Sequence, residues 1–379
     1  MPAMAPLVYL DYNATTPIAP EVLEAMLPYL KEHFGNPSSG HAFGVRARQA
    51  VDAARAQVAS LLACSPDEIV FTGGGTEANN LALFGVVEAA KISCVIISAV
   101  EHPAVEEPCR ALEKRGVEVV RLPVDGEGVV VLAELDRALA RPGRLLLSVL
   151  HANNETGALQ PVGEIARRSH ARGALVHTDA AQSVGKTDAR VGELGVDLLS
   201  VAGHKLYAPK GVGALFVRAG TPLSAFARGA GHERGLRPGT ENVASLVGLG
   251  AASELALTHP AGEHLAAMAG RLLDGLRALV PGLALNGPAQ QVGRLPNTLN
   301  VSAPGLLGRR WLEAAPEIAA STGSACHAGK DEPSGVLTAM GLSRERALGA
   351  LRLSVGRPTT PEQIDEAIAA LSRAARPLA

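Results

Sequence analysis

The chain contains few aromatic residues and few cysteines, and it carries almost no net charge. Only 3% of its 379 residues are aromatic, and the formal net charge at pH 7 is -2. No long block of Lys or Arg occurs, so a surface for nucleic acid or for an acidic membrane is not indicated. Four cysteines are too few for a disulfide framework in a chain of this length, and none belongs to a CxxC pair, which argues against a zinc site.

Long apolar runs are also missing. No stretch of 18 uncharged apolar residues occurs, and the uncharged run 278–293 is interrupted by Pro and Gly. Residues 1–13 lack a basic segment followed by an apolar one. We therefore expect no membrane span, no signal peptide and a cytoplasmic protein. Hydrophobic residues make up 47% of the chain, enough for sizeable buried cores, and the length predicts about two domains.

Between residues 50 and 220, short β-rich runs alternate with helical stretches. The runs predicted to be strands are 68–72, 94–100, 117–122, 144–150, 173–179 and 197–203. They are apolar nearly throughout, which is typical of a sheet that is buried on both faces. The intervening segments are long enough for crossover helices, so the pattern predicts a mostly parallel, doubly wound α/β sheet. Residues 211–217 follow a turn-rich segment and are expected to form an antiparallel strand.

The pattern changes from about residue 242 onward. Residues 253–280 predict one long helix that bridges to a second domain. This domain would hold strands at 296–302 and 352–357 and a C-terminal helix that starts near Pro361. Composition alone does not place the first dozen residues.

A glycine-rich turn follows the first predicted strand of the large sheet. Residues 72–77 read TGGGTE and lead into a predicted helix. Glycines at such a turn let backbone N–H groups approach an anion, and the helix N-terminus adds partial positive charge. The segment lacks the spacing of a dinucleotide fingerprint and the Gly-Lys-Ser/Thr ending of a Walker A loop. Phosphate binding and a plain tight turn both remain open here.

Polar residues also follow two later strands. Asp179 ends one strand, with Gln182 three residues further on, and His204 and Lys205 end the next. The carboxyl ends of strands in such sheets are where ligands bind. A Lys and an Asp that converge there suit pyridoxal phosphate, because the Lys forms a Schiff base and the Asp keeps the pyridine nitrogen protonated. A buried Asp–Lys ion pair explains the two residues equally well.

Eleven segments, which together span nearly the whole chain, occur in the order typical of one family. They are YLDYNATTP (9–17), FGNPSS (34–39), FTGGGTEANN (71–80), EHPAV (101–105), HANNETG (151–157), HTDAAQSVGK (177–186), GHKLYAPKG (203–211), ERGLRPGTEN (233–242), RLPNT (294–298), STGSACHAG (321–329) and LRLSVGR (351–357). In these segments the chain resembles the NifS/IscS-type cysteine desulfurases, which belong to the class V aminotransferase group of pyridoxal-phosphate enzymes. Selenocysteine lyases are similar to the same motifs.

The resemblance implies a fold and a domain division. The expected fold is the α/β type I fold of PLP-dependent transferases, with a mostly parallel sheet in the large domain and a smaller α+β C-terminal domain. The large PLP-binding domain would comprise residues 15–255. Residues 1–14 and 256–379 would form the small domain, which carries the loop of the catalytic cysteine and the arginine for the substrate.

The resemblance also assigns residues to the cofactor, pyridoxal 5'-phosphate. Lys205 matches the Schiff-base lysine, Asp179 matches the partner of the pyridine nitrogen, and His102 is similar to the imidazole that stacks on the ring and moves protons. Two further groups are implied as hydrogen-bond partners. Those of the ring hydroxyl are Asn153 and Gln182, and those of the phosphate are Gly75, Thr76 and His204. Thr240 resembles the threonine that reaches the phosphate of the neighbouring subunit, which implies a homodimer.

The remaining roles concern the substrate, L-cysteine. Arg352 resembles the arginine that binds the substrate carboxylate, and Asn13 is implied to assist it. Cys326 lies in a segment rich in small and polar residues and matches the thiolate that takes the sulfur as a persulfide, with L-alanine released. Pro333 follows it by seven residues, a spacing that resembles the long-loop desulfurases. The sulfur would pass to an acceptor or scaffold protein, such as one for iron–sulfur cluster assembly.

The other three cysteines are interpreted differently. Cys94 lies in a predicted strand, and Cys64 and Cys109 lie on predicted helices, so we interpret all three as small buried hydrophobic residues.

Some positions depart from the family pattern, and other interpretations stay open. Ala202 stands where a serine is usual, Ala208 where a glycine is common and His232 where a glutamine is common. The alternatives are a selenocysteine lyase, another class V PLP enzyme in which Cys326 is incidental, and a cofactor-free scaffold that recruits iron–sulfur assembly proteins. The last has no need for Lys205 and Asp179 together. We expect neither nucleic acid as a stable partner nor a membrane.

Overall fold

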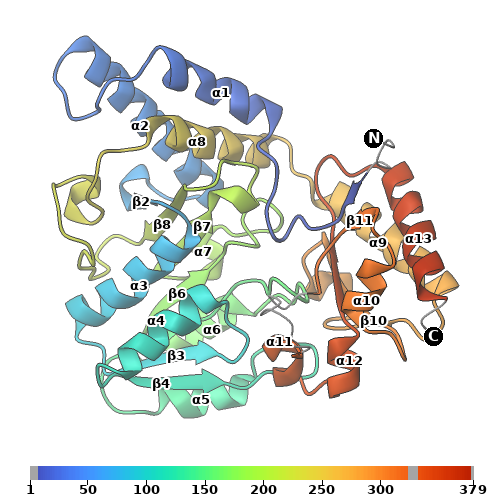
Figure 1. The fold of residues 1–379 in the computed structure, drawn as a ribbon. Coiled ribbons are helices and arrows are strands. Elements are labelled where there is room, and N and C mark those ends of the chain that lie inside the picture. The colour runs from blue at the N-terminus through green and yellow to red at the C-terminus, as the bar shows by residue number, and fades with distance from the viewer. Residues whose placement is uncertain (1–6, 323–331, 377–379) are drawn as a thin grey trace.

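A seven-stranded sheet forms the larger part of the molecule in the computed structural model, which describes residues 7–322 and 332–376 (Figure 1). The spatial order is β2-β8-β7-β6-β5-β3-β4. The strands are β2 (Ile69–Thr72), β3 (Cys94–Ser98), β4 (Glu118–Leu122), β5 (Leu145–Ser148), β6 (Leu175–Asp179), β7 (Leu198–Ala202) and β8 (Gly213–Val217). Only β8 pairs antiparallel with its neighbours; the other pairs are parallel. The predicted sheet, including the antiparallel strand at 211–217, is confirmed.

Helices cover both faces of this sheet because its strands are apolar on both sides. Alternate residues of a strand enter different cores, as Ile96 does on one face and Val95 on the other. One face is covered by α2 (Ala42–Leu62), α5 (Leu132–Leu139), α6 (Val162–His170) and α8 (Val243–Thr258). The opposite face is covered by α3 (Gly75–Ala90) and α4 (Pro103–Glu113). Helix α1 (Pro20–Lys31) packs on α8, and the short α7 (Val191–Leu194) precedes β7.

The C-terminal part has its own sheets and its own hydrophobic core. A three-stranded antiparallel sheet has the order β12-β10-β9, and β1 pairs parallel with β11. These strands are β1 (Val8–Tyr9), β9 (Ala284–Leu285), β10 (Thr298–Ser302), β11 (Ile318–Ala319) and β12 (Leu351–Ser354). The helices are α9 (Gly262–Leu279), α10 (Gly308–Glu313), α11 (Gly335–Ala339), α12 (Arg344–Leu348) and α13 (Pro361–Ala375). The predicted strands at 296–302 and 352–357 and the helix at Pro361 are therefore confirmed.

The N-terminal strand packs into this C-terminal core. Val8 and Leu10 are buried in the same cluster as Trp311 and the apolar face of α13, and the described N-terminal segment lies beside α13 in Figure 1. This packing supports the division into residues 15–255 and residues 1–14 with 256–379, which we retain as a proposal.

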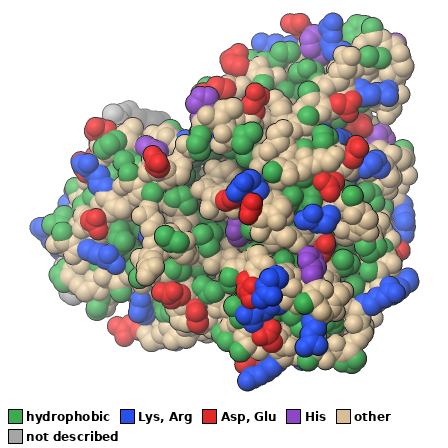
Figure 2. All heavy atoms as spheres, turned by 180° about the vertical axis from the view of Figure 1, so that it is seen from behind, with side chains coloured by type: hydrophobic (Ala, Val, Ile, Leu, Met, Phe, Trp, Pro, Cys, Tyr) green, Lys and Arg blue, Asp and Glu red, His purple; other side chains and the backbone are tan. Residues whose placement is uncertain are grey.

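One predicted element is wrong. Residues 253–280 do not form one helix: α8 ends at Thr258 and α9 begins at Gly262. Pro260 lies between them. Its ring has no N–H to donate and clashes with the preceding turn, which ends a helix. Among the described helices, none is long and apolar enough to cross a membrane. On the face shown in Figure 2, acidic and basic side chains are interspersed.

Candidate active site

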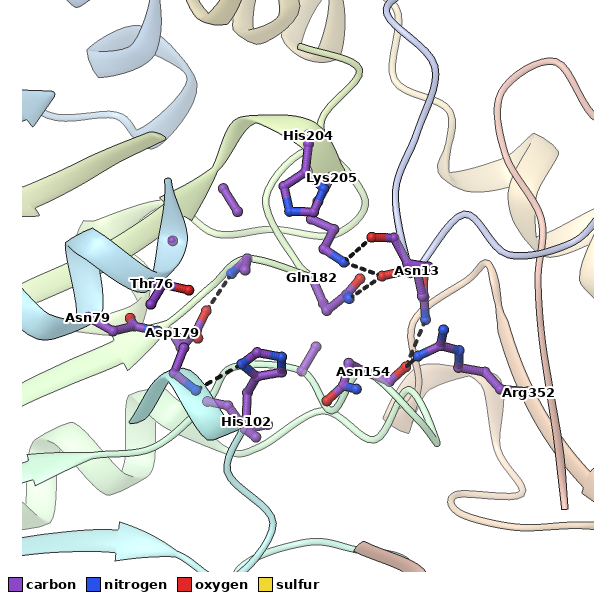
Figure 3. Close-up of a pocket in the computed structure, with 17 residues that line it drawn as sticks. Asn13, Thr76, Asn79, His102, Asn154, Asp179, Gln182, His204, Lys205 and Arg352 are labelled. Carbon is purple, nitrogen blue, oxygen red and sulfur yellow. Dashed lines mark hydrogen bonds between the residues drawn. The ribbon is translucent and has the colours of Figure 1, made fainter. Parts of the chain in front are cut away.

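Polar residues from several strand ends meet at one edge of the large sheet. Strands β3, β5, β6 and β7 run parallel, so the segments after them emerge at the same edge. A cavity of about 320 Å³ lies there. The predicted residues that line it are Asn13, Gly75, Thr76, His102, Asp179, Gln182, His204, Lys205 and Arg352 (Figure 3). Residues far apart in the sequence are thus brought into one site.

The carboxylate of Asp179 is held in a fixed orientation at the end of β6. Its Oδ2 accepts a hydrogen bond from Asn79 Nδ2 at 2.7 Å, and its Oδ1 accepts one from the backbone N–H of Ala181 at 2.9 Å. Asn79 lies one turn into α3, so the helix that follows the glycine-rich turn also positions this acid. Each carboxylate oxygen can accept more than one hydrogen bond, which leaves capacity for a donor from the cavity.

Lys205 follows β7 in a short 3-10 turn, Gly203–Lys205, and its side chain points at the N-terminal segment (Figure 3). Its ammonium donates to the backbone oxygen of Ala14 at 2.6 Å and to that of Asn13. Burial, followed by the positive charge of Arg352, lowers the pKa of Lys205 to about 8. An appreciable fraction of this amine is neutral near pH 7, and a neutral amine can attack a carbonyl carbon.

His102 caps the N-terminus of α4 and faces the same cavity. Its Nδ1 accepts from the backbone N–H of Ala104 at 3.1 Å, so the neutral ring carries its proton on Nε2. Burial is the main reason that the pKa of His102 lies below its usual value. A neutral imidazole with Nε2 free of the backbone can stack on a ring and exchange a proton.

Glu101, the neighbour of His102, ties two strand ends together. Its Oε1 lies 2.5 Å from Ser98 Oγ, at the end of β3, and accepts from the N–H of Leu150, just after β5, at 3.0 Å. Burial raises the pKa of Glu101 to about 8. The largely uncharged carboxyl therefore supports the turn that carries His102.

The glycine-rich turn forms the other end of the site. Gly74, at the N-cap of α3, has φ +144°, a conformation that favours glycine. A second cavity of about 650 Å³ shares Gly75, Thr76 and His204 with the first and adds Lys210. Burial lowers the pKa of His204 to about 4, so this ring is neutral. Helix N–H groups and a lysine together suit an anion such as a phosphate.

Arg352 reaches the cavity from β12 in the C-terminal part. Its Nη2 pairs with Asp11 Oδ1 at 2.7 Å, and its Nη1 donates to the backbone oxygen of Asn154 at 3.3 Å. The side chain is only 7% exposed, and its Nε has no partner among the described residues. A buried arginine that lines the cavity is suited to a carboxylate from a ligand.

The structure does not bring every predicted residue to the cavity. Asn153 Oδ1 accepts from the backbone N–H groups of Glu155 and Thr156 at 2.9 and 3.0 Å, so its amide closes its own loop; Asn154 lines the cavity instead. Thr240 is exposed and lies away from the cavity. Cys326 lies outside the described residues.

The other cysteines are poor nucleophiles. Burial raises the pKa of the Cys94 thiol to about 11 and those of Cys64 and Cys109 to about 12. Cys94 lies in β3 and Cys109 in α4, as predicted. Cys64 follows α2 rather than lying on it, because Ala63 ends that helix with φ 54°. No cluster of His, Cys, Asp and Glu suited to a metal occurs among the described residues.

Asn79 and Asn154 were not assigned from the sequence. Asn79 lies within the quoted segment FTGGGTEANN, and a four-residue step from Gly75 along α3 would have indicated it. Asn154 is adjacent to the predicted Asn153, and no periodic signal separates the two in a loop.

The residues present fit pyridoxal phosphate. A lysine amine of lowered pKa, a fixed carboxylate with spare acceptor capacity, an imidazole and a glycine-rich helix N-terminus are the groups that this cofactor needs. The fold, with a mostly parallel sheet and the lysine at a strand end, is that of the PLP-dependent transferases of type I. The chain belongs to the aminotransferase class-V family, whose model matches residues 8–367.

Curated relatives and solved structures agree with this class. A cysteine desulfurase IscS from Dictyoglomus turgidum is 44% identical over 375 residues, covering 97% of this chain and 94% of the relative. A cysteine desulfurase IscS from Aeromonas salmonicida is 45% identical, with 95% and 91% covered. The structure of a NifS-like protein superposes with a TM-score of 0.90 at 36% identity, covering 97% and 98%. A structure described as SspA in complex with cysteine has a TM-score of 0.81 at 36% identity, covering 92% and 98%.

Proposed function

We propose that the protein is a PLP-dependent cysteine desulfurase, which converts L-cysteine to L-alanine and takes the sulfur as a persulfide on Cys326. The observation that carries the proposal is the joint presence of the Lys205–Asp179 pair and the Arg352 donor in one cavity, in a chain 42–45% identical to cysteine desulfurases over at least 95% of its length. The same relatives favour cysteine over selenocysteine as the substrate.

The cofactor would be held at both ends of the cavity. Lys205 would bind it covalently, Asp179 would hold the proton of the ring nitrogen, and Gln182 would donate to the ring hydroxyl. We propose Asn154 in place of Asn153 as a further polar residue there, since Asn154 lines the cavity. The N-terminus of α3, with Thr76 and His204, would bind the phosphate. When bound, pyridoxal phosphate supplies an electron sink that stabilises negative charge at the substrate Cα.

The chain's own residues then perform the remaining steps. Arg352 binds the substrate carboxylate through its buried guanidinium, which fixes the orientation of the amino acid. The amine of Lys205, which the amino group of the substrate would displace from the cofactor, would take the Cα proton, and His102 would move a proton through Nε2. Asn13 is predicted to assist with the substrate, and its own backbone oxygen accepts a hydrogen bond from Lys205.

The sulfur transfer requires a thiolate. The Cys326 sulfur attacks the substrate sulfur, the bond from that sulfur to Cβ breaks, and a sulfur–sulfur bond forms on Cys326. The electron pair of the broken bond returns to the substrate carbon, which gains a proton and leaves as alanine. The persulfide is passed to an acceptor protein, and we propose iron–sulfur cluster assembly in the cytoplasm as the setting.

We further propose a homodimer. Phe34 and Phe43 are 77% and 56% exposed, and their rings lie 5.5 Å apart at the surface. The segment that carries them also borders a cavity of about 700 Å³, whose other wall includes His232 and Glu233 from the segment of Thr240. An exposed aromatic pair, together with an exposed threonine that does not line the cavity of its own chain, suits a second copy of the chain. Light scattering should show a dimer, and Phe43→Glu should shift it toward monomer.

One assay tests the proposed activity. Purified protein is incubated with L-cysteine, and alanine and protein-bound sulfane sulfur are measured. Both should appear in equal amounts in the first turnover, with the added sulfur on the peptide that contains Cys326. Cys326→Ser should bind the cofactor normally but form neither product, because a hydroxyl is too weak an acid to replace the thiolate. Alanine formation at the wild-type rate by this variant would sink the proposal and leave another class V PLP enzyme. Activity on selenocysteine alone would indicate the lyase.

A further inference from the structure

Lys186 lies behind the wall of the cavity and contacts two of its residues. Its Nζ donates to Gln182 Oε1 at 3.0 Å and to Asn13 Oδ1 at 3.4 Å, but Lys186 itself does not line the cavity. Lys186 is partly exposed as a residue, while its amine donates to these two buried amides. Within residues 7–322 and 332–376 no carboxylate pairs with it.

The charges around Lys186 do not explain its position. Burial, and then the positive charges of Lys205 and Arg352, lower the pKa of Lys186 to about 7. A lysine placed for charge pairing would have a carboxylate partner, and this one has two positively charged neighbours instead. Its two acceptors match the two N–H groups of a neutral amine, and an ammonium can donate to them equally. The hydrogen bonds to the amides are therefore what this residue provides at any pH near neutrality.

The hydrogen bond from Lys186 fixes the direction of the Gln182 amide. Because Gln182 Oε1 accepts from Lys186 Nζ, its Nε2 points away from Lys186. Gln182 Nε2 then donates to the backbone oxygen of Asn13 at 2.9 Å (Figure 3). The second N–H of this amide has no partner among the described residues, and Gln182 lines the cavity. The orientation thus leaves one N–H for a ligand.

The amide of Asn13 is fixed in the same way. Its Oδ1 accepts from Lys186 and, at 3.0 Å, from Asn297 Nδ2. Its Nδ2 donates to Thr298 Oγ1 at 2.8 Å and to the backbone oxygen of Asn154 at 3.2 Å. The backbone oxygen of the same Asn13 accepts from Lys205 and from Gln182. Asn13 is therefore the junction through which Lys186 reaches the Lys205 amine.

We propose that Lys186 is a positioning residue for cofactor binding. It orients the amide of Gln182 so that one Gln182 N–H faces the cavity, and it orients Asn13 so that the Asn13 backbone oxygen accepts from Lys205. The inference rests on the proposed binding of pyridoxal phosphate and not on the desulfurase reaction. It concerns a residue that touches neither substrate nor cofactor.

The test measures the affinity of the apoprotein for pyridoxal phosphate by absorbance titration. Lys186→Met keeps the shape of the side chain but removes its donors, and we expect the dissociation constant to rise about tenfold, as for the loss of one or two hydrogen bonds. Lys186→Arg retains N–H donors and should recover most of the affinity. Lys114→Met, at the exposed end of α4, is the matched control and should leave the constant unchanged.

A double-mutant cycle separates positioning from packing. If Lys186 acts in part through Gln182, the change Lys186→Met should cost less affinity in the Gln182→Ala background than in the wild-type background. The same loss of affinity from Lys186→Met in both backgrounds, or an affinity of Lys186→Met within twofold of wild type, would overturn the proposal. Thermal unfolding of each apoprotein identifies any loss of fold, and the arginine variant then decides. This test measures cofactor affinity and not alanine formation. Wild-type protein that binds the cofactor but leaves cysteine intact would therefore contradict the proposed desulfurase activity and not the role of Lys186. Wild-type protein that does not bind the cofactor refutes both.

Discussion

The two ends of the cavity are built differently. The Asp179 end comes from the large sheet, and both of its carboxylate oxygens already have donors from α3 and from the adjacent turn. The Arg352 end comes from β12, is held by Asp11 from the N-terminal segment and keeps a buried Nε without a partner among the described residues. The comparison indicates that the cofactor end is built within the large domain's sheet and α3, whereas the substrate end is assembled from the N-terminal segment and β12.

The largest effect on activity is expected from a substitution at the cofactor end of the cavity. Lys205→Ala removes the only amine that lines the described cavity, so alanine formation from cysteine should fall by at least about 10³-fold. Borohydride reduction followed by peptide mapping should place the cofactor on the peptide of Lys205 in wild type. A reduced adduct on another lysine in the variant, with activity retained, would contradict the assignment. Lys114→Met serves as the control.

Asp179→Asn should have the next largest effect. The amide keeps the contacts of Asp179 in part, but it cannot hold a proton on the ring nitrogen, so kcat should fall by about 10²-fold or more while the cofactor stays bound. Asp136→Asn, an exposed acid paired with Arg168, is the matched control. Full turnover at full cofactor occupancy would show that Asp179 lacks this role.

Arg352→Lys tests the substrate end and should act on KM. Lysine retains the charge but not the planar, two-pronged donor set, so KM for cysteine should rise about tenfold or more, with kcat changed less. Arg373→Lys, an exposed residue of α13, provides the comparison. A fall in kcat with KM unchanged would move Arg352 from substrate binding to a step after it.

The smallest effect concerns the pH dependence of stability through Glu101. Because the pKa of Glu101 is raised to about 8 in the folded protein, the folded state keeps a proton that the unfolded chain loses above its usual pKa near 4.5. The free energy of unfolding should therefore decrease as pH rises from about 5 to 8, by at most on the order of 1 kcal/mol per pH unit from this group. Glu101→Gln removes this loss. Urea unfolding at pH 5 and pH 8 should show its advantage over wild type growing with pH; a constant difference would refute the buried neutral carboxyl.

The site residues at strand ends were more predictable from the sequence than those in loops. Apolar runs of strand length that end in polar residues placed Asp179 and Lys205 at one sheet edge, because parallel strands impose that geometry. Loop direction has no such rule, so the choice between Asn153 and Asn154 required the structure. The parallel pairing of Val8 with Ile318 joins residues 310 positions apart, and no local pattern indicates such a contact. The helix break at Pro260 could have been predicted, because proline ends helices. The prediction of one long helix gave more weight to the apolar periodicity on both sides of Pro260.

The pairing of the N-terminal segment with the C-terminal part also sets the order in which a newly made chain can complete its site. The backbone oxygen of Leu10 accepts from the N–H of Ser354. The carboxylate of Asp11 pairs with Arg352, which is synthesised 341 residues later. At a synthesis rate of about 5–20 residues per second, β1 stays without its partner strand for roughly 15–60 s after it leaves the ribosome. The large sheet can form during that time. The backbone oxygen of Asn13, which accepts from Lys205, is positioned in part by the hydrogen bond from the Asn13 N–H to Ser354 Oγ, and Ser354 lies near the end of the chain. Binding of the cofactor in its final geometry is therefore a late event in the life of each new molecule.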